Sequence, residues 1–337
     1  MSHRFDIIPV PTEAGTHFPG QCKASHAIMY DGRLIEKLRA QVSDNVVIHG
    51  EVDKDDFGIL GKEIGNLAKW KPSEKVNGVR NLDNSLRIMQ HLHQYLLSQA
   101  DNLGASFPIA LGGDCSITPA VLSAFYHFHQ GKKVGLLYID GDADLTLPSQ
   151  TSAEGSSGIL DSMNMSHLTR RDGSLKPMSE FSRPDGSALI TPDNVVLFGF
   201  DPLQPATEHW VYLVENGFKC FTRPTVQRDL VGSVRTALQY LEERVDVILL
   251  HFDVDVIDSG LFPLANYPHY AGLKFKEAMQ VIDMFLRCET VKGLIITEVN
   301  PNNDAAWVDP EASGEKPLTM IQRLVDWIMP SLVQRFG

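Results

Sequence analysis

The stretch VGLLYIDGDAD, residues 134–144, places three aspartates at every second position directly after a run of apolar residues. A run of this kind predicts a buried strand, and open α/β sheets bind ligands beyond the carboxyl ends of their strands. In extended backbone Asp140, Asp142 and Asp144 lie on one side. Carboxylates held that close repel each other unless a cation lies between them. The stretch therefore predicts a divalent metal site at a strand end.

A second stretch, VILLHFDVDVID at residues 247–258, repeats this arrangement. Asp253 and Asp255 again follow an apolar run and share a face. A single aspartate at such a place most often forms a turn or caps a helix. Two such sets at two strand ends favour the metal site over that interpretation.

The composition limits the classes of protein to which the chain can belong. With 337 residues it can bury a large core, and its net charge of −12 argues against a nucleic-acid or anionic-membrane partner. We find neither a secretory N-terminus nor an apolar run of about 18 residues. The four cysteines are far apart and form no C-x-x-C pair. We therefore expect a cytoplasmic protein without a disulfide framework.

Strand and helix patterns alternate along the chain. The clearest helix is predicted over residues 81–100, where apolar residues recur at helical spacing, and a long polar segment follows at residues 145–194. This alternation predicts an α/β fold in which helices cover both faces of a mainly parallel sheet, and the length allows either one domain or two. Strands are expected at residues 5–10, 45–52, 107–111, 134–139, 195–200, 218–222, 247–250 and 293–299, and further helices at 34–42, 119–130, 208–215, 229–243, 274–286 and 318–329.

Four strand ends carry motifs that, in this order, resemble those of the ureohydrolase family, which includes the arginases, agmatinases and formiminoglutamases. GGDCS (112–116) resembles the family's G-G-D-H-S, and DGDAD (140–144) resembles D-A-H-x-D. HFDVDVIDS (251–259) resembles S-x-D-x-D-x-x-D-P, and EVNP (298–301) a late E-x-N-P element. The resemblance implies one arginase-like α/β domain of three layers over residues 1–337, and a small guanidino or amidino substrate.

The resemblance also implies roles for the matching residues. It implies two Mn²⁺ ions, bridged by a hydroxide that attacks a guanidinium carbon. Six side chains are implied as metal ligands: Asp140 and Asp253 for both ions, Cys115 and Asp144 for the first, and Asp142 and Asp255 for the second. Glu298 orients the guanidinium, for which a carboxylate is a fork-shaped partner. Independently of the family, an oxygen-rich site suits Mn²⁺, and a bound cation lowers the pKa of water.

Cys115 and Asp142 stand where the family's motifs have histidine. Four carboxylates and two neutral imidazoles balance two divalent ions, whereas five carboxylates and a thiolate give −6 against +4. Three alternatives relieve that excess: Cys115 stays protonated and does not bind, one ion binds instead of two, or no metal binds and some carboxylates are protonated.

Three further residues are candidates for the site. His251 shares a face with Asp253 and could supply a neutral ligand, although a buried core histidine is the favoured interpretation. The segment at residues 155–161 aligns loosely with the family's S-G-N-L-H, which places Asp161 near the position of a proton-shuttling histidine in arginases. Asp161 can act as a general acid only if its surroundings raise its pKa. His167 is the alternative proton donor, against the interpretation of a solvated loop residue.

Two functions remain open at this point. The first is an active metal-dependent hydrolase of a C–N bond, and the second is a ureohydrolase-fold pseudoenzyme that serves as a binding or regulatory protein. A Mg²⁺ phosphotransfer site is a weaker third possibility, because no Gly-rich phosphate loop supports it. Bound metal and urea release separate the first two. The resemblance also favours a symmetric homo-oligomer.

Overall fold

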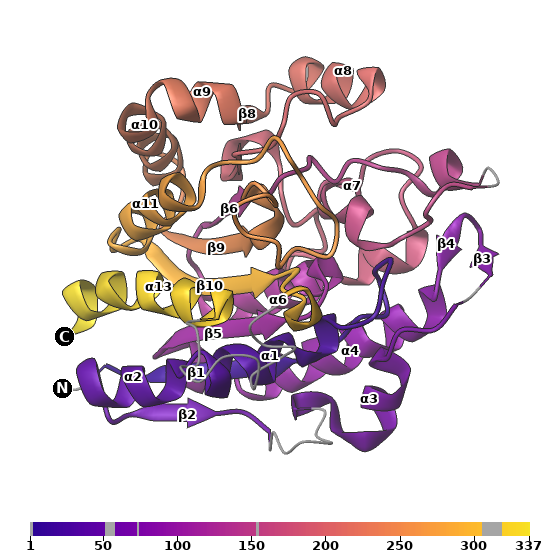
Figure 1. Cartoon of the computed structure of the whole chain (residues 1–337). Coiled ribbons are helices and arrows are strands. Elements are labelled where there is room, and N and C mark those ends of the chain that lie inside the picture. The colour runs from indigo at the N-terminus through magenta and orange to yellow at the C-terminus, as the bar shows by residue number, and fades with distance from the viewer. Residues whose placement is uncertain (1–2, 51–57, 73, 153–154, 305–318) are drawn as a thin grey trace.

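Eight parallel strands form the central sheet of the protein (Figure 1). The computed structural model describes residues 3–50, 58–72, 74–152, 155–304 and 319–337, and all elements refer to this part of the chain. Each neighbouring pair in the sheet is parallel. The strands follow one another across the sheet in the order β2 (Val46–Ile48), β1 (Phe5–Val10), β5 (Phe107–Gly112), β10 (Val291–Thr297), β9 (Val247–Asp253), β6 (Val134–Ile139), β7 (Val195–Phe198) and β8 (Lys219–Phe221).

Helices cover both faces of this sheet. On one face α10 (Leu230–Glu242), α11 (Phe275–Leu286) and α13 (Met320–Phe336) lie side by side, with α2 (Leu34–Gln41) against α13. On the other face lie α4 (Leu82–Ser98) and α6 (Thr118–Phe128). The other described helices are α1 (Ala24–His26), α3 (Gly61–Ala68), α5 (Ala100–Gly104), α7 (Asn164–Leu168), α8 (Thr207–Glu215) and α9 (Arg223–Arg228), and β3 (Lys75–Val76) and β4 (Val79–Arg80) form a small hairpin. The predicted three-layer α/β fold is confirmed.

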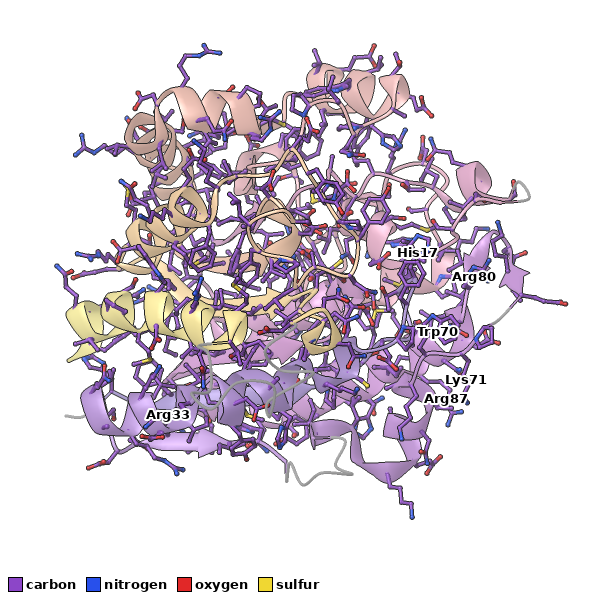
Figure 2. The ribbon with its side chains drawn as sticks, in the orientation of Figure 1. His17, Arg33, Trp70, Lys71, Arg80 and Arg87 are labelled. Atoms are coloured by element: carbon purple, nitrogen blue, oxygen red, sulfur yellow. The ribbon has the colours of Figure 1, made fainter. Side chains whose placement is uncertain are left out.

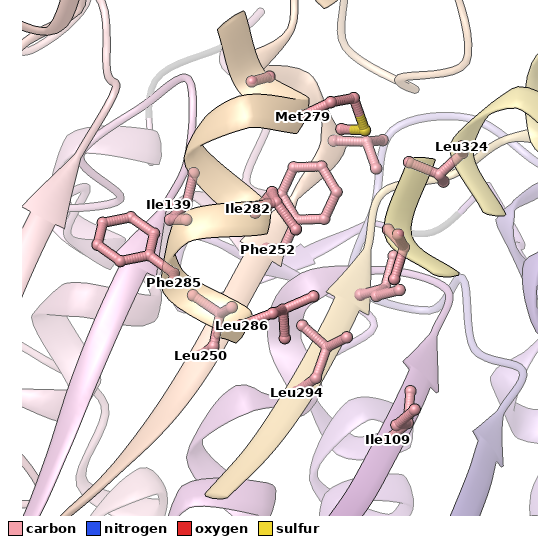
Figure 3. Close-up of a cluster of buried hydrophobic side chains, with 14 of the residues drawn as sticks. Ile109, Ile139, Leu250, Phe252, Met279, Ile282, Phe285, Leu286, Leu294 and Leu324 are labelled. Carbon is pink, nitrogen blue, oxygen red and sulfur yellow. The ribbon is translucent and has the colours of Figure 1, made fainter. Parts of the chain in front are cut away.

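Alternate residues of each strand face the two helical layers. In β6, Leu137 and Ile139 belong to the core on the α11 side, part of which Figure 3 shows. Leu136 and Tyr138 belong to the core on the α6 side. All four side chains are buried. Burial on both faces explains why these strands appear in the sequence as continuous apolar runs.

The last helix is longer than predicted. A helix expected over residues 318–329 stops before Pro330, whereas α13 continues through Pro330 to Phe336, and residue 318 lies outside the described residues. A proline inside a helix removes one backbone hydrogen bond. The last turn is held instead by packing, because the Phe336 ring lies 5.1 Å from that of Phe5 and 5.2 Å from that of Phe107, measured between centroids.

Two other segments differ in detail from the prediction. The strand expected at residues 45–52 is only three residues long as β2, and residues 51–52 lie outside the described residues. The polar segment at 145–194 contains α7 and several short 3-10 helices. No helix within the described residues is long and apolar enough to cross a bilayer. The single domain over residues 1–337 and the cytoplasmic location stay predictions.

Candidate metal centre

The four strand ends that carry motifs meet around one cavity. Because β5, β10, β9 and β6 are neighbours in a parallel sheet, their carboxyl ends lie at the same edge. The cavity at this edge has a volume of about 370 Å³. Eight of the ten candidate side chains line it: Cys115, Asp140, Asp142, Asp144, Asp161, Asp253, Asp255 and Glu298.

His167 is one of the two exceptions, the other being His251. His167 lies in α7, its side chain is buried, and it is not among the residues that line the cavity. Burial lowers the pKa of its imidazole to about 3. The structure therefore does not bring His167 to the site as a proton donor, nor is His167 a solvated loop residue.

Backbone N–H groups hold the aspartates at the strand ends. The amide of Asp142 donates to Asp140 Oδ1 at 2.7 Å, and the amide of Asp255 donates to Asp253 Oδ1 at 3.0 Å. The amide of Gly141 donates to Asp255 Oδ1 at 2.9 Å, which links the ends of β6 and β9. These bonds fix the orientation of each carboxylate before any ion binds.

Neutral donors surround Cys115 and Asp144. The Tyr138 hydroxyl donates to Asp144, and Asn164 Nδ2 donates to Cys115 Sγ at 2.9 Å. Burial raises the pKa of the Cys115 thiol well above its ordinary value, and the nearby carboxylate of Asp144 raises it further. Without a cation, Cys115 is therefore a neutral thiol.

Asp161 lies at the edge of this group and lines the cavity. Burial raises the pKa of its carboxyl group well above the ordinary value, and repulsion from Glu298 adds to the shift. This is the condition that a general acid at this position requires.

Glu298 is held in place from two sides. It follows β10 with a left-handed φ of 65°, and its own amide donates to the carbonyl of Gly113 at 2.8 Å. Its carboxylate accepts a hydrogen bond from the amide of Cys115 at 2.9 Å and another from the side chain of Gln21. Asn266 in turn donates to Gln21 Oε1 at 3.1 Å. The sequence motifs did not indicate Gln21 or Asn266, because Gln21 begins a short 3-10 helix and Asn266 lies in a loop, both outside the four motifs.

The acidic lining fits a divalent cation. Neither lysine nor arginine is among the residues that line the cavity. Burial raises the pKa of Asp140 and Asp253 well above the ordinary value, and repulsion between the carboxylates raises it further. A bound cation relieves both effects, and this oxygen-rich donor set suits Mn²⁺. Possible ligand atoms of Asp140, His251 and Asp253 all lie within 4.8 Å of one another, as do those of Cys115, Asp253 and Glu298.

His251 is the buried core histidine that the sequence favoured, but one of its nitrogens is unused. Its ring is stacked on that of Tyr138 at 4.3 Å, and Nδ1 forms a hydrogen bond with Thr118 Oγ1 at 3.1 Å. Nε2 has no hydrogen-bond partner in the part of the chain that the structure describes. The imidazole is therefore held by Tyr138 and Thr118 and keeps one nitrogen available near Asp140 and Asp253.

His269 is a residue of the site that the motifs did not reveal. It lies in the loop between β9 and α11, with Nε2 3.3 Å from Asp255 Oδ2 and 3.5 Å from Asp142 Oδ2. Burial alone would lower the pKa of His269, but attraction to Asp255 and Asp142 outweighs it and raises the pKa to about 9. The same attraction overcomes burial at Asp255 and holds the pKa of that carboxyl group below its ordinary value.

Aromatic side chains stand beside the cavity. His17 and Tyr267 both line it, and their rings are stacked with centroids 6.1 Å apart. Trp70 Nε1 donates to the carbonyl of His17 at 2.9 Å, and Figure 2 shows Trp70 and Arg80 next to His17. This arrangement joins the N-terminal loop to the segment that carries His269.

Comparison with known proteins assigns the family. Residues 3–313 match the model of the arginase family. The chain is 26% identical over 298 residues to an arginase of Staphylococcus aureus, which covers 88% of this chain and 89% of that one. It is 29% identical over 304 residues to human arginase-1, which covers 89% of this chain and 86% of that one.

Solved structures of arginases share the fold. The arginase of Entamoeba histolytica, crystallised with L-ornithine, has a TM-score of 0.76 at 18% identity and covers 98% of each chain. The formimidoylglutamase of Bacillus subtilis has a TM-score of 0.65 at 14% identity and covers 98% of this chain and 87% of that one. The structural likeness shows the fold and the family match extends over most of the chain, so this protein belongs to the arginase family.

Proposed function

We propose that the protein is a metal-dependent hydrolase that cleaves a C–N bond in a small guanidino or amidino compound. One observation carries the proposal: four neighbouring strand ends bring the acidic residues of the arginase-family motifs to a single cavity without lysine or arginine in its lining. The relatives named above are hydrolases, which supports this reaction class.

The predicted ligands keep their roles in the proposal. Asp140 and Asp253 would hold both Mn²⁺ ions, Cys115 and Asp144 the first, and Asp142 and Asp255 the second. When bound, the metal supplies the positive charge that makes water a nucleophile near neutral pH. The backbone bonds to Asp140, Asp253 and Asp255 support this assignment, because they leave each carboxylate oriented for binding.

Two residues act on the substrate. Glu298 binds the guanidinium or amidinium group, and its orientation is set by the amide of Cys115 and the side chain of Gln21. Asp161 delivers a proton to the leaving nitrogen, which its raised pKa supports. The acidic cavity attracts a cationic substrate, and its volume of about 370 Å³ suits a small molecule.

A pseudoenzyme that binds a ligand without hydrolysing it is the second candidate. Cys115 and Asp142 replace the two histidines of the family's motifs, and Asp142 is paired with His269 instead of being free. In this alternative the cavity serves a binding or regulatory role with an altered or absent metal site.

Metal content and product release distinguish the two candidates. The purified protein is loaded with Mn²⁺, desalted and measured by elemental analysis, and then incubated with arginine, agmatine, guanidinobutyrate and formiminoglutamate while urea and ammonia are assayed. We expect bound Mn²⁺ and turnover of at least one of these compounds. Less than about a tenth of an equivalent of metal per chain contradicts a metal-dependent reaction. Bound metal without turnover of any compound favours the pseudoenzyme.

The assembly and location of the protein remain predictions. We expect a homo-oligomer, from the family resemblance, and a cytoplasmic protein that binds neither nucleic acid nor membrane. Size-exclusion chromatography with light scattering measures the assembly, and an elution at the mass of one 37.4 kDa chain contradicts it.

A further inference from the structure

A closed loop between β9 and α11 places His269 next to Asp142 and Asp255, two carboxylates that line the cavity. The amide of Ser259 donates to the carbonyl of His269 at 2.8 Å, and the amide of His269 donates to Ser259 Oγ at 3.0 Å. The amide of Asp258 donates to the carbonyl of Leu273 at 2.8 Å and closes the base of the loop. The backbone thus sets the place of the His269 imidazole without help from the ring itself.

The ring is buried within ion-pair distance of two carboxylates but forms no hydrogen bond with either. His269 is 3% exposed, and its Nε2 lies 3.3 Å from Asp255 Oδ2 and 3.5 Å from Asp142 Oδ2. Neither ring nitrogen has a partner with hydrogen-bond geometry among the residues that the structure describes. A buried polar side chain usually has a partner, so an imidazole left in this state points to a ligand between these groups.

We infer that the imidazole of His269 is the nitrogen ligand of the second metal ion, in place of the histidine that the family's second motif supplies from position 142. The inference rests on the proposed metal-dependent function. It concerns a residue outside all four motifs. Asp142 then joins His269 and Asp255 around the same ion.

The distance from Nε2 to each carboxylate agrees with two neighbouring ligands of one ion. Ligand atoms about 2.1 Å from a common metal ion stand roughly 3 to 3.5 Å apart when they are adjacent in octahedral or tetrahedral geometry. The separations of Nε2 from the two carboxylate oxygens, 3.3 and 3.5 Å, fall in that range. The Asp142 side chain is 34% exposed, so it has room to adjust as the ion binds.

Gly141 supplies an independent argument. The family's motif has alanine at this position, whereas this chain has glycine between Asp140 and Asp142. A Cβ atom at position 141 would stand 2.9 Å from Cδ2 of His269 and 2.8 Å from the carbonyl oxygen of Asp255. The motif therefore departs at two adjacent positions, and both departures have one explanation. Gly141 makes room for the imidazole ring of His269. Because His269 supplies that ring, position 142 does not need to be a histidine.

The test follows the ring nitrogens directly. Protein labelled with ¹⁵N in its histidine rings is titrated with Zn²⁺, a diamagnetic probe, and long-range ¹H–¹⁵N spectra are recorded. We expect one ring to show the nitrogen shift of metal coordination, and we expect that resonance to be missing from His269→Asn and from His269→Gln. Because the backbone bonds of the loop do not involve the ring, both variants should keep the loop in place.

A matched control is available in the same chain. His129 lies at the end of α6, is not among the residues lining the cavity, and also has a ring nitrogen without a partner among the described residues. His129→Asn should lose a resonance that does not respond to Zn²⁺. Calorimetry with Mn²⁺ should show that His269→Asn weakens binding by at least about tenfold while His129→Asn does not.

The outcomes separate this inference from the proposed function. Bound metal together with an unshifted His269 resonance overturns the inference and leaves the proposed function standing. If His269→Asn binds Mn²⁺ more tightly, or binds one more equivalent of Mn²⁺ than the wild type, the inference is also overturned. The imidazole would then block the second ion instead of binding it. Wild-type protein that binds neither Mn²⁺ nor Zn²⁺ overturns both.

Discussion

The two halves of the cavity meet the same excess of negative charge in different ways. The Cys115 half, formed by Cys115, Asp144 and Asp161, is stabilised by neutral donors such as the Tyr138 hydroxyl. Burial and repulsion raise the pKa of all three groups and so favour their protonated forms when no cation is bound.

The His269 half, formed by Asp142, Asp255 and His269, contains its own basic side chain. Attraction to His269 holds the pKa of Asp255 below its ordinary value despite burial. Burial raises the pKa of Asp142 to about 6, against the opposing attraction to His269. The comparison teaches that a neighbouring imidazole, helped by a backbone hydrogen bond, outweighs burial at Asp255, whereas the neutral donors around Asp144 do not outweigh burial there. We therefore expect the two halves to respond differently to substitution.

The largest effect is expected at Asp253, one of the two residues proposed to bind both ions. Asp253→Asn removes a negatively charged ligand shared by both proposed ions. We expect Mn²⁺ affinity to fall by about 100-fold or more and hydrolysis to be lost. The fold should remain, because the asparagine oxygen can still accept the amide of Asp255. Calorimetry, activity and circular dichroism are read together. Asp258→Asn is the control, since Asp258 follows the same strand but does not line the cavity. A folded Asp253→Asn protein with full activity removes Asp253 from the site.

A smaller effect is expected from Cys115, because its thiol must lose a proton before it can bind a cation. Protein loaded with Co²⁺ should show a thiolate-to-metal charge-transfer band that disappears in Cys115→Ser, with Mn²⁺ affinity lower by roughly tenfold. Cys220→Ser, which lies outside the cavity, should keep the band. If wild-type protein shows no band, Cys115 stays a thiol and the Cys115 half binds through carboxylates alone.

The smallest effect is on the stability of the metal-free protein, and its sign follows from the pKa shifts. Asp142 has a pKa of about 6 in the folded protein against about 3.9 in the unfolded chain, so the folded state binds more protons across this interval. The free energy of unfolding should therefore fall as the pH rises from about 4 to 6. His269, with its pKa raised to about 9, acts in the same direction between about pH 6.5 and 9.

Thermal unfolding checks this prediction. Chelator-treated protein should have a lower Tm at about pH 8 than at about pH 5, and Mn²⁺ should remove much of the difference. Asp142→Asn should flatten the dependence between about pH 4 and 6. A Tm of the metal-free protein that rises over this range contradicts the charge assignment of the His269 half.

Local features of the sequence were sufficient for the fold class and for most of the cavity. Apolar runs at β6 and β9, alternating with helical periods, predicted the parallel sheet, because both faces of its strands are buried. The spacing of Asp140, Asp142 and Asp144 predicted acidic strand ends. These properties depend on neighbouring residues, and so they can be recognised without knowing the strand order.

Tertiary structure decided the rest of the site. Whether Asp161 or His167 reaches the cavity depends on how the segment at 145–194 folds over the sheet, and that segment has no period to predict it. His269 lies 14 residues after Asp255 in a loop whose closure depends on Ser259. It reaches Asp142 only because β6 and β9 are neighbours and Gly141 leaves space for the ring. Contacts between residues distant in the sequence are set by strand order and packing, which the local pattern of residues does not contain.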